Sequence, residues 1–284
     1  MMEKQRTLRG NAALTGIALH TGARATLKIR PAEENSGIVF RRVDLPGAPE
    51  VRALASNVVE VQRGTTIAAP NGGVVHTVEH VMSALHAYRI DNCVVEMDGM
   101  EPPICDGSAL PYAELVEEAG IAEQEAPART FTPAAPVAVV HGGTRLAIIP
   151  DPEKLTLSCV TSFKGCPVDP QFCDFTLTEP GLYRREIAPG RTFVDYGDLK
   201  MLLAMGLVKG GSLDAAAIIH DGAIICKEGL RFPNEIVRHK ILDLIGDLYL
   251  VGCRVTGTVV AVKSGHPTHV ALAGKLLAEA SARR

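Results

Sequence analysis

A helix predicted over residues 233–249 constrains the fold of this chain more than any other stretch. Pro233 and Asn234 suit the entry to a helix, and Glu235 suits its first turn. Large apolar side chains then recur at helical spacing and predict one buried stripe. These residues are Val237, Ile241, Leu244, Ile245 and Leu248.

Polar side chains form a second row along the same helix. His239 and Asp243 are separated by four positions, which places them roughly 40° apart around the axis. Two side chains arranged in this way can share one metal ion. Asp247 continues the row. The row lies away from the apolar stripe, so from this stretch alone an ordinary solvated face stays an alternative to a metal site.

Another helix is predicted around residues 76–86, where Val78, Val81 and Met82 begin a helical apolar pattern. Glu79 and His80 fall outside that pattern. Adjacent helical residues point about 100° apart, so the two side chains cannot both point in the same direction. They can serve one ion in different roles, His80 as a ligand and Glu79 as a base beside the ligated water. The spacing does not fit the H-E-x-x-H pattern of zinc proteases.

Composition narrows the class of protein. The 284 residues are 46% hydrophobic and 21% charged, which favours an enzyme-sized globular chain with two domains rather than one. A net charge of −3 gives no sign of nucleic-acid binding. The seven cysteines contain no C-x-x-C pair, and the start at Met1–Arg6 has no apolar core. We therefore expect a cytoplasmic protein with no disulfide framework and no transmembrane segment.

The remaining pattern favours an α+β fold in two halves. Each half offers several strands followed by helices. The stretch 123–136 is rich in Ala, Pro and charge and is the best candidate for a domain boundary, giving domains 1–125 and 126–284. Strands are expected at 25–30, 37–42, 90–97, 137–140, 145–149, 155–160, 216–219, 223–226 and 257–262, and further helices at 108–119, 198–205 and 268–282.

Several motifs taken together resemble the zinc-dependent UDP-3-O-acyl-N-acetylglucosamine deacetylases of lipid A biosynthesis. The resemblance covers essentially the whole chain, and its specificity lies in the order of the motifs rather than in any one of them. They are Gly16–Gly22, Thr77-Val78-Glu79-His80, Gly190-Arg191-Thr192-Phe193, Gly206–Asp214, Gly229-Leu230-Arg231-Phe232, Val237–Asp243 and Ser264-Gly265-His266.

This resemblance implies a fold and a metal site. Family members have two similar domains, each a β-sheet with two helices, packed as a β-α-α-β sandwich with small inserts. The first domain would supply Glu79 and His80, and the second would supply Thr192, His239, Asp243 and His266. The zinc ligands would be His80, His239 and Asp243.

Catalytic roles are implied in the same way. Glu79 matches the general base, and His266, at the end of a strand, matches a general acid or electrostatic stabiliser. Asp247 would orient His266 and raise its pKa. Thr192 would help zinc to stabilise the oxyanion, and Lys240 would bind substrate and stabilise charge.

Substrate contacts are implied more loosely. Phe193 matches a residue packed against the sugar nucleotide, and Leu19 is another expected contact. An apolar passage for the fatty chain would come from an insert in the second domain, although ordinary core packing is an alternative for each of its candidates. These are Leu199, Leu203, Val208, Ser212 and Ala215.

The implied activity is zinc-dependent hydrolysis of the N-acetyl group of UDP-3-O-acyl-N-acetylglucosamine by a monomer, with Fe²⁺ able to replace Zn²⁺ in cells. A zinc amidohydrolase acting on another N-acetylated substrate is the alternative. A non-catalytic module stabilised by a metal ion should lack a base and an acid beside the ligands, so the presence of Glu79 and His266 disfavours it. The sequence departs from the family pattern at Gly190, at Asp195 and in the turn Lys164-Gly165-Cys166-Pro167.

Overall fold

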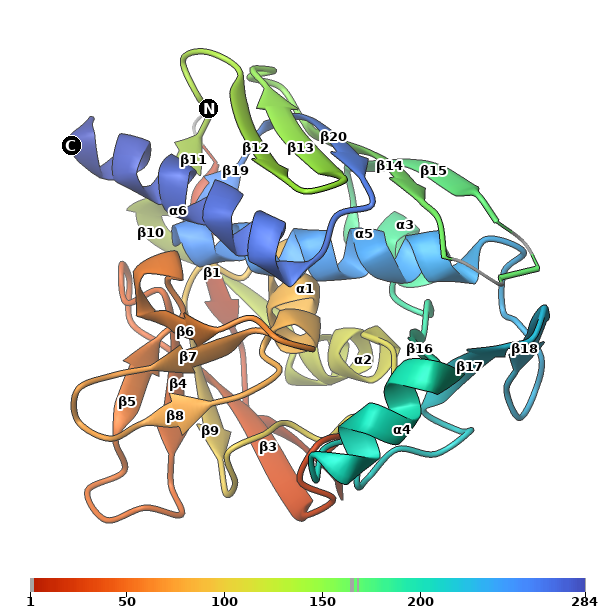
Figure 1. Ribbon diagram of the computed structural model, residues 1–284. Helices are drawn as coiled ribbons and strands as arrows, with labels where there is room; N and C mark the ends of the chain where they lie inside the picture. The colour runs from red at the N-terminus through yellow and green to blue at the C-terminus, as the bar shows by residue number, and fades with distance from the viewer. Residues whose placement is uncertain (1–2, 164–165, 168, 284) are drawn as a thin grey trace.

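Two five-stranded sheets form the outer layers of the molecule, and helices lie between them (Figure 1). The computed structural model describes residues 3–163, 166–167 and 169–283, so Lys164 and Gly165 of the unusual turn lie outside the described residues. The first sheet, in the order β2-β3-β9-β4-β5, contains β2 (Ala12–Ile17), β3 (Arg24–Pro31), β4 (Ile38–Arg42), β5 (Glu50–Arg52) and β9 (Cys93–Met97). The second, in the order β12-β13-β20-β14-β15, contains β12 (Val137–His141), β13 (Thr144–Ile149), β14 (Leu155–Thr161), β15 (Gln171–Leu177) and β20 (Gly257–Val262).

The two sheets repeat one topology. In each, the last strand along the chain pairs parallel with the third and antiparallel with the second, as β9 does with β4 and β3, and β20 with β14 and β13. In each half, four strands are followed by an insert, a helix, the last strand and a second helix. The prediction of two similar α+β domains is therefore confirmed.

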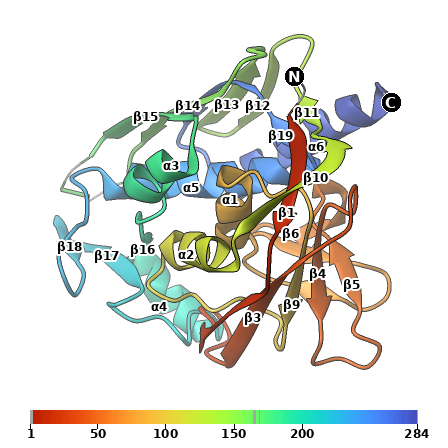
Figure 2. The same cartoon turned by 180° about the vertical axis from the view of Figure 1, so that it is seen from behind.

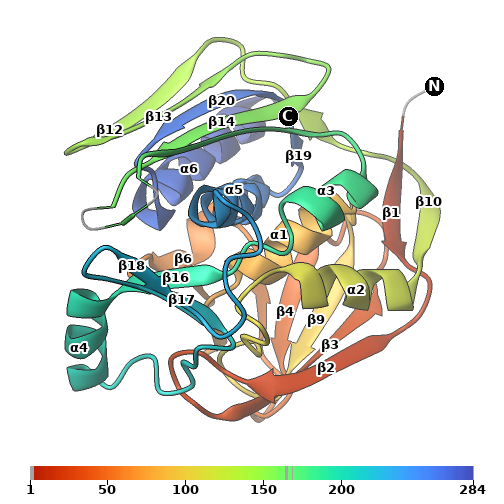
Figure 3. The same ribbon diagram turned by 90° about the vertical axis from the view of Figure 1, so that its right-hand side faces the viewer.

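Each half contributes two helices to the middle of the sandwich, as the end-on view in Figure 3 shows. The pair α1 and α5 packs at the centre. In α2, Gly120 ends the helix with a φ of 70°, a conformation that glycine adopts without steric cost. The helices are α1 (Glu79–Ala87), α2 (Leu110–Ala119), α5 (Glu235–Leu248) and α6 (His266–Ala282).

An insert precedes the central helix in each half. The first contains η1 (Ala55–Asn57), β6 (Val58–Glu60), β7 (Thr66–Ala68) and β8 (Val74–Val75). The second contains α3 (Pro180–Glu186), β16 (Thr192–Asp195), α4 (Tyr196–Ala204), β17 (Ala216–His220) and β18 (Ala223–Ile225). Asp195, one of the unusual residues, caps α4 by accepting a hydrogen bond from Gly197 N at 2.8 Å.

Two short strand pairs run along the back of the molecule (Figure 2). β1 (Lys4–Leu8) pairs with β10 (Ile121–Pro127), and β11 (Thr130–Phe131) pairs with β19 (Arg254–Val255), which follows η2 (Tyr249–Val251). The stretch predicted to contain the domain boundary therefore carries the end of β10 and all of β11. The division at residue 125 stays a prediction.

The central helix α5 is buried on nearly all sides. Its predicted apolar stripe is in the core, with Val237, Ile241 and Leu244 at 0% exposure. The polar row is buried too, since His239, Asp243 and Asp247 are only 2%, 1% and 0% exposed. The interpretation of that row as a solvated face is therefore wrong. Buried ionisable side chains need partners, and the row faces the other domain.

One glycine lets the two domains approach each other. A Cβ atom on Gly246 of α5 would lie 2.0 Å from the backbone oxygen of Glu79, the first residue of α1. Neither backbone can move aside without shifting its helix. The helices therefore cross at a separation that only glycine permits.

We predict that Gly246→Ala lowers the free energy of unfolding by about 1–3 kcal/mol, because the added methyl group overpacks the helix crossing. Urea denaturation measures this change. Gly274→Ala in α6 is the matched control, since a Cβ there meets nothing within 4 Å. Gly274→Ala should leave the free energy of unfolding unchanged or raise it by up to about 1 kcal/mol. Equal effects of the two substitutions would contradict the close crossing.

Candidate active site and metal centre

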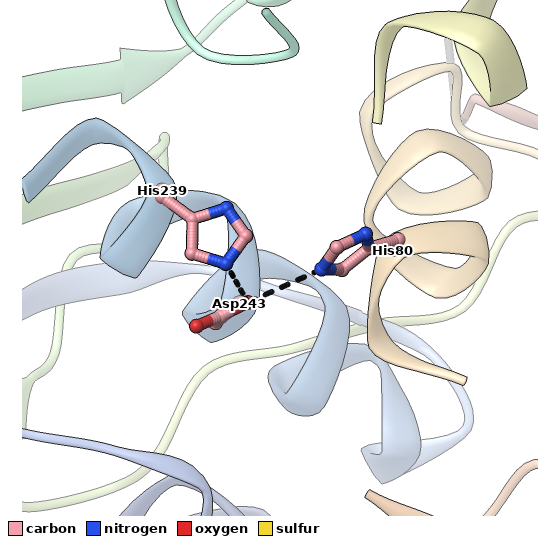
Figure 4. Close-up of side chains that lie close together, drawn as sticks. All are labelled: His80, His239 and Asp243. Atoms are coloured by element: carbon pink, nitrogen blue, oxygen red, sulfur yellow. Dashed lines mark ion pairs between the residues drawn. The ribbon is translucent and has the colours of Figure 1, made fainter. Parts of the chain in front are cut away.

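Three side chains from the two central helices converge between the domains. His80 lies in the first turn of α1, and His239 and Asp243 lie on successive turns of α5 (Figure 4). Asp243 Oδ1 is 3.3 Å from His239 Nε2 and 3.8 Å from His80 Nε2. One candidate donor atom from each side chain lies within 4.8 Å of the other two. The structure thus brings the three predicted metal ligands together.

The chemistry of these groups fits a metal ion. His239 Nδ1 donates a hydrogen bond to Gly190 O at 3.0 Å, which leaves the Nε2 lone pair directed at the group. Burial, reinforced by the neighbouring imidazole, lowers the pKa of His80 to about 3, so its ring is neutral. Among the described residues, Asp243 Oδ1 and His80 Nδ1 are buried without a hydrogen-bond partner. Two neutral imidazoles and one carboxylate are a common set of three protein ligands for catalytic zinc.

The second oxygen of Asp243 has a different partner. Lys240 Nζ contacts Asp243 Oδ2 at 2.9 Å and lies 5.2 Å from the centre of the Phe193 ring. Burial alone would raise the pKa of Asp243, but the neighbouring His239, Lys240 and His266 hold it well below its usual range. Asp243 is therefore an anion at neutral pH, as a carboxylate must be to bind a metal ion.

Glu79 lies beside the three residues and is 3% exposed. Its Oε2 accepts a hydrogen bond from Thr65 N at 3.0 Å. Burial raises the pKa of Glu79 to about 7, and the carboxylates of Asp247 and Asp243 act in the same direction against the opposing charge of His266. A carboxylate with a pKa near the working pH can both accept and return a proton.

His266 faces Glu79 from the other domain. Its Nε2 is 3.7 Å from Glu79 Oε1, and its Nδ1 is 2.9 Å from Asp247 Oδ2. Burial lowers the pKa of His266, but the carboxylates of Asp247, Glu79 and Asp243 outweigh it and raise the pKa to about 9. The structure places His266 at the first position of α6, not at the end of a strand. This position disfavours a cation, so the nearby carboxylates must also overcome the helix dipole.

These groups line one cleft with a volume of about 340 Å³. Thr192 and Phe193 form part of its wall, and Phe193 packs edge-on against Phe163 at 4.7 Å. Leu19 also lines the cleft and belongs to a small apolar cluster with Ile104, Ala215 and the partly buried Val208.

The other predicted passage residues lie elsewhere. Leu199 is half-buried on α4, and Leu203 and Ser212 are exposed. None of the three belongs to the lining of the cleft among the described residues. Their assignment to an acyl passage stays a prediction.

Sequence reasoning missed residues that hold the site in place. Arg191 and Glu235 form a buried ion pair at 2.8 Å that ties the start of β16 to the start of α5. Thr65 Oγ1 donates to Asp247 Oδ1 at 2.7 Å, and His269 Nδ1 contacts Asp247 Oδ2 at 3.0 Å. Thr65 and Asp247 are 182 residues apart, so no local spacing could connect them. His269 does carry a local signal, because it follows His266 by one helical turn.

Two neutral histidines and an aspartate beside a perturbed glutamate and histidine define a metal-dependent hydrolase. The sequence model of the LpxC family, UDP-3-O-acyl N-acetylglycosamine deacetylase, matches residues 5–278. The chain belongs to this family of zinc-dependent deacetylases of lipid A biosynthesis. It is therefore an enzyme that hydrolyses an amide bond.

Relatives named UDP-3-O-acyl-N-acetylglucosamine deacetylase match nearly the full chain. The protein from Myxococcus xanthus is 43% identical over 277 residues, covering 98% of this chain and 87% of its own. The protein from Chlamydia felis is 43% identical over 281 residues, covering 98% of this chain and 99% of its own. The protein from Phenylobacterium zucineum is 40% identical over 281 residues, covering 99% of this chain and 95% of its own. No helix within the described ranges has the length and apolar character needed to cross a bilayer.

We predict that Asp243→Ala weakens zinc binding by at least about 10- to 100-fold. That is the loss typical when a residue that only supports a metal ligand is removed, and removal of a ligand itself should cost no less. The substitution removes one of the three predicted ligands, the only anionic one among them. Zinc content after dialysis against a graded chelator measures the change. Asp174→Ala on the exposed side of β15 is the control and should retain zinc. Unchanged affinity in Asp243→Ala would remove this residue from the ligand set.

Proposed function

We propose that this chain hydrolyses the N-acetyl group of UDP-3-O-acyl-N-acetylglucosamine, giving acetate and the free amine in the committed step of lipid A biosynthesis. One observation carries the mechanism. Glu79 Oε1 and His266 Nε2 face each other at 3.7 Å beside the three candidate ligands, and the two residues come from opposite domains. A proton acceptor and a proton donor therefore share one cleft.

His80, His239 and Asp243 would hold the catalytic zinc, or Fe²⁺ in cells. Bound zinc supplies a Lewis acid that polarises the acetamide carbonyl and lowers the pKa of an attacking water. Lys240 neutralises part of the charge on Asp243, and its position between Asp243 and Phe193 leaves it at the cleft wall, where it contacts substrate.

Glu79 acts as the general base. With its pKa near 7, a large fraction of Glu79 is ionised at neutral pH and can take the proton of the attacking water. The hydrogen bond from Thr65 N fixes Glu79 Oε2 and leaves Oε1 directed at His266 and the cleft. The base is therefore aimed before substrate arrives.

His266 acts as the cation and proton donor. Its raised pKa keeps the imidazolium form at neutral pH, with Nδ1 held by Asp247 and Nε2 directed at the cleft. A cation at this place stabilises the developing oxyanion and delivers a proton to the leaving amine. Thr192, on the same wall of the cleft, adds a hydroxyl donor to the oxyanion.

The substrate would extend from the catalytic groups in two directions. Phe193 offers a flat apolar face for the sugar nucleotide. The apolar cluster of Leu19, Val208 and Ala215 offers a place for the start of the fatty chain, with Leu199 and Ser212 farther out on the insert. This cluster favours a lipid-bearing substrate over the alternative, an amidohydrolase for another N-acetylated compound. A cytoplasmic monomer is part of the same proposal.

The test is to strip the metal and assay deacetylation of UDP-3-O-acyl-N-acetylglucosamine with and without one equivalent of zinc. Because the candidate ligands come from the chain itself, zinc alone should restore turnover. UDP-N-acetylglucosamine without the acyl chain is the matched control substrate and should react far more slowly. A folded, zinc-loaded protein that is inactive on the acylated substrate would refute the proposed substrate and favour the alternative.

We predict a bell-shaped dependence of kcat/KM on pH. Turnover should rise as pH increases through about 7, because Glu79 must lose its proton to act as a base. It should fall as pH increases through about 9, because His266 must keep its proton. A profile of initial rates across this range measures both limbs.

Glu79→Gln is the matched variant for that profile. It preserves the shape of the side chain and should retain zinc while kcat falls about 10²- to 10⁴-fold. The residual activity of Glu79→Gln should no longer rise as pH increases through about 7, so the acid limb of the profile should be absent. An acid limb that persists unchanged in Glu79→Gln would show that another group is the titrating base.

A further inference from the structure

We propose that His269 is a positioning residue for the deacetylation, acting through Asp247 on His266. The proposal rests on the function proposed above. His269 is 0% exposed, lies outside the ligand group and has no part in the mechanism as described so far. A buried imidazole is costly unless its ring nitrogens are hydrogen-bonded, and both nitrogens of His269 have partners within the protein.

The contacts of His269 fix the form of its ring. Its Nε2 lies 2.9 Å from Ser264 Oγ, and its Nδ1 lies 3.0 Å from Asp247 Oδ2. A carboxylate can only accept, so Nδ1 carries the proton and donates it to Asp247. Burial lowers the pKa of His269, which keeps the ring neutral, so Nε2 accepts from the Ser264 hydroxyl. The chain of donors therefore runs from Ser264 through His269 to Asp247.

Asp247 receives donors on both oxygens. Oδ2 accepts from His266 Nδ1 at 2.9 Å and from His269 Nδ1 at 3.0 Å, while Oδ1 accepts from Thr65 Oγ1 at 2.7 Å. Three donors arriving from two domains fix the plane of this carboxylate. The hydrogen bond to His266 then has only one direction available, which sets the direction of His266 Nε2 toward the cleft.

The spacing along α6 makes this arrangement possible. His266 and His269 are three positions apart, so their side chains lie on one face of the helix and reach the same oxygen of Asp247 on α5. The distances of 2.9 and 3.0 Å are those of hydrogen bonds. Both Nδ1 atoms of this second His–Asp group carry protons that they donate to Asp247, so neither has a lone pair for an ion, and positioning is the role that its geometry supports.

The expected effect is on turnover rather than on substrate or zinc binding. Without His269, the Asp247 carboxylate can rotate, and His266 Nε2 loses its fixed place. Misplacement of a catalytic group by about 1 Å can cost on the order of 100-fold in rate. We expect His269→Leu to lower kcat about 10- to 100-fold while KM changes less than about 3-fold and zinc content stays unchanged.

His269→Asn is the matched conservative variant. The Asn amide nitrogen occupies nearly the place of Nδ1 and can still donate to Asp247, so kcat should recover to within about 5-fold of the original protein. Ser264→Ala is a gentler variant at a half-buried turn and should fold even if His269→Leu does not. It removes the outer donor and should lower kcat about 2- to 10-fold.

A double-mutant cycle with Asp247→Ala tests the route of action. If His269 acts only through Asp247, adding His269→Leu to Asp247→Ala should change kcat by less than about 2-fold. The proposal would be overturned if the losses of kcat in His269→Leu and Asp247→Ala multiplied in the double variant. An unchanged kcat in both His269→Leu and Ser264→Ala would overturn it as well. A parallel loss of zinc would also overturn it, because it would make His269 a general structural residue.

Nitrogen-15 NMR of the imidazoles separates this proposal from the proposed substrate. In the zinc-loaded protein without substrate, His269 should show a protonated, exchange-protected Nδ1, and this signal should disappear in His269→Leu. The Nδ1 proton of His266 should exchange faster in that variant. These results hold even if the acylated substrate is wrong. An unprotonated Nδ1 on His269 would refute the positioning role whatever the substrate.

Discussion

The site depends on the contact between Gly246 and the backbone of Glu79. Each domain carries only part of the chemistry: α1 supplies Glu79 and His80, while α5 supplies His239 and Asp243. These groups meet because the helices cross where a Cβ atom would lie 2.0 Å from a backbone oxygen. An ordinary helix pair packs at 8–10 Å between axes, with side chains between the backbones. A glycine at the crossing removes that spacer and places both helices at one cleft.

Close approach creates an electrostatic difficulty, because three carboxylates are buried within one region. Their environments differ in the donors and charges around each carboxylate. Asp247 accepts from three side chains, and Asp243 lies beside the ammonium of Lys240. Glu79 accepts one backbone hydrogen bond and faces the other two carboxylates. Buried carboxylates with several donors or a nearby cation stay ionised, and the one that faces other carboxylates has the highest pKa. The base is thus distinguished from the ligand by its neighbours, since all three share one functional group.

Much of the fold follows from local sequence patterns. The helix at 235–248 and seven of the ten strands in the two sheets match the predicted periodicities, because the 3.6- and 2-residue repeats are properties of short segments. Strands β2, β5 and β15 were not predicted. The same local reasoning left the row of His239, Asp243 and Asp247 open between a solvated face and a metal site. Its burial depends on α1 and on the contact with Thr65, which lies 182 residues from Asp247 in the chain. Residue spacing along one helix carries no information about such a partner.

The resemblance to a family supplied that long-range information for His80 but not for the supporting residues. Glu235 and His269 hold the site residues without belonging to the family motifs on which the resemblance rested, and Arg191 and Ser264 stand within those motifs without a role that the resemblance implied. Their roles follow from a hydrogen-bond inventory of buried groups, which requires coordinates. A sequence can therefore name the groups that do chemistry more readily than those that aim them.

The repeated topology explains where the cleft is. Each insert enters the chain between the fourth strand of its sheet and the central helix of its domain. Both inserts therefore reach the ends of α1 and α5 that carry the site. Arg63 of the first insert pairs with Asp198 of the second at 2.6 Å, and Gly210 N donates to Leu19 O at 2.9 Å. The duplicated core brings the catalytic groups together, and the unlike inserts enclose them, so substrate selection can change without disturbing the helix crossing on which the chemistry depends.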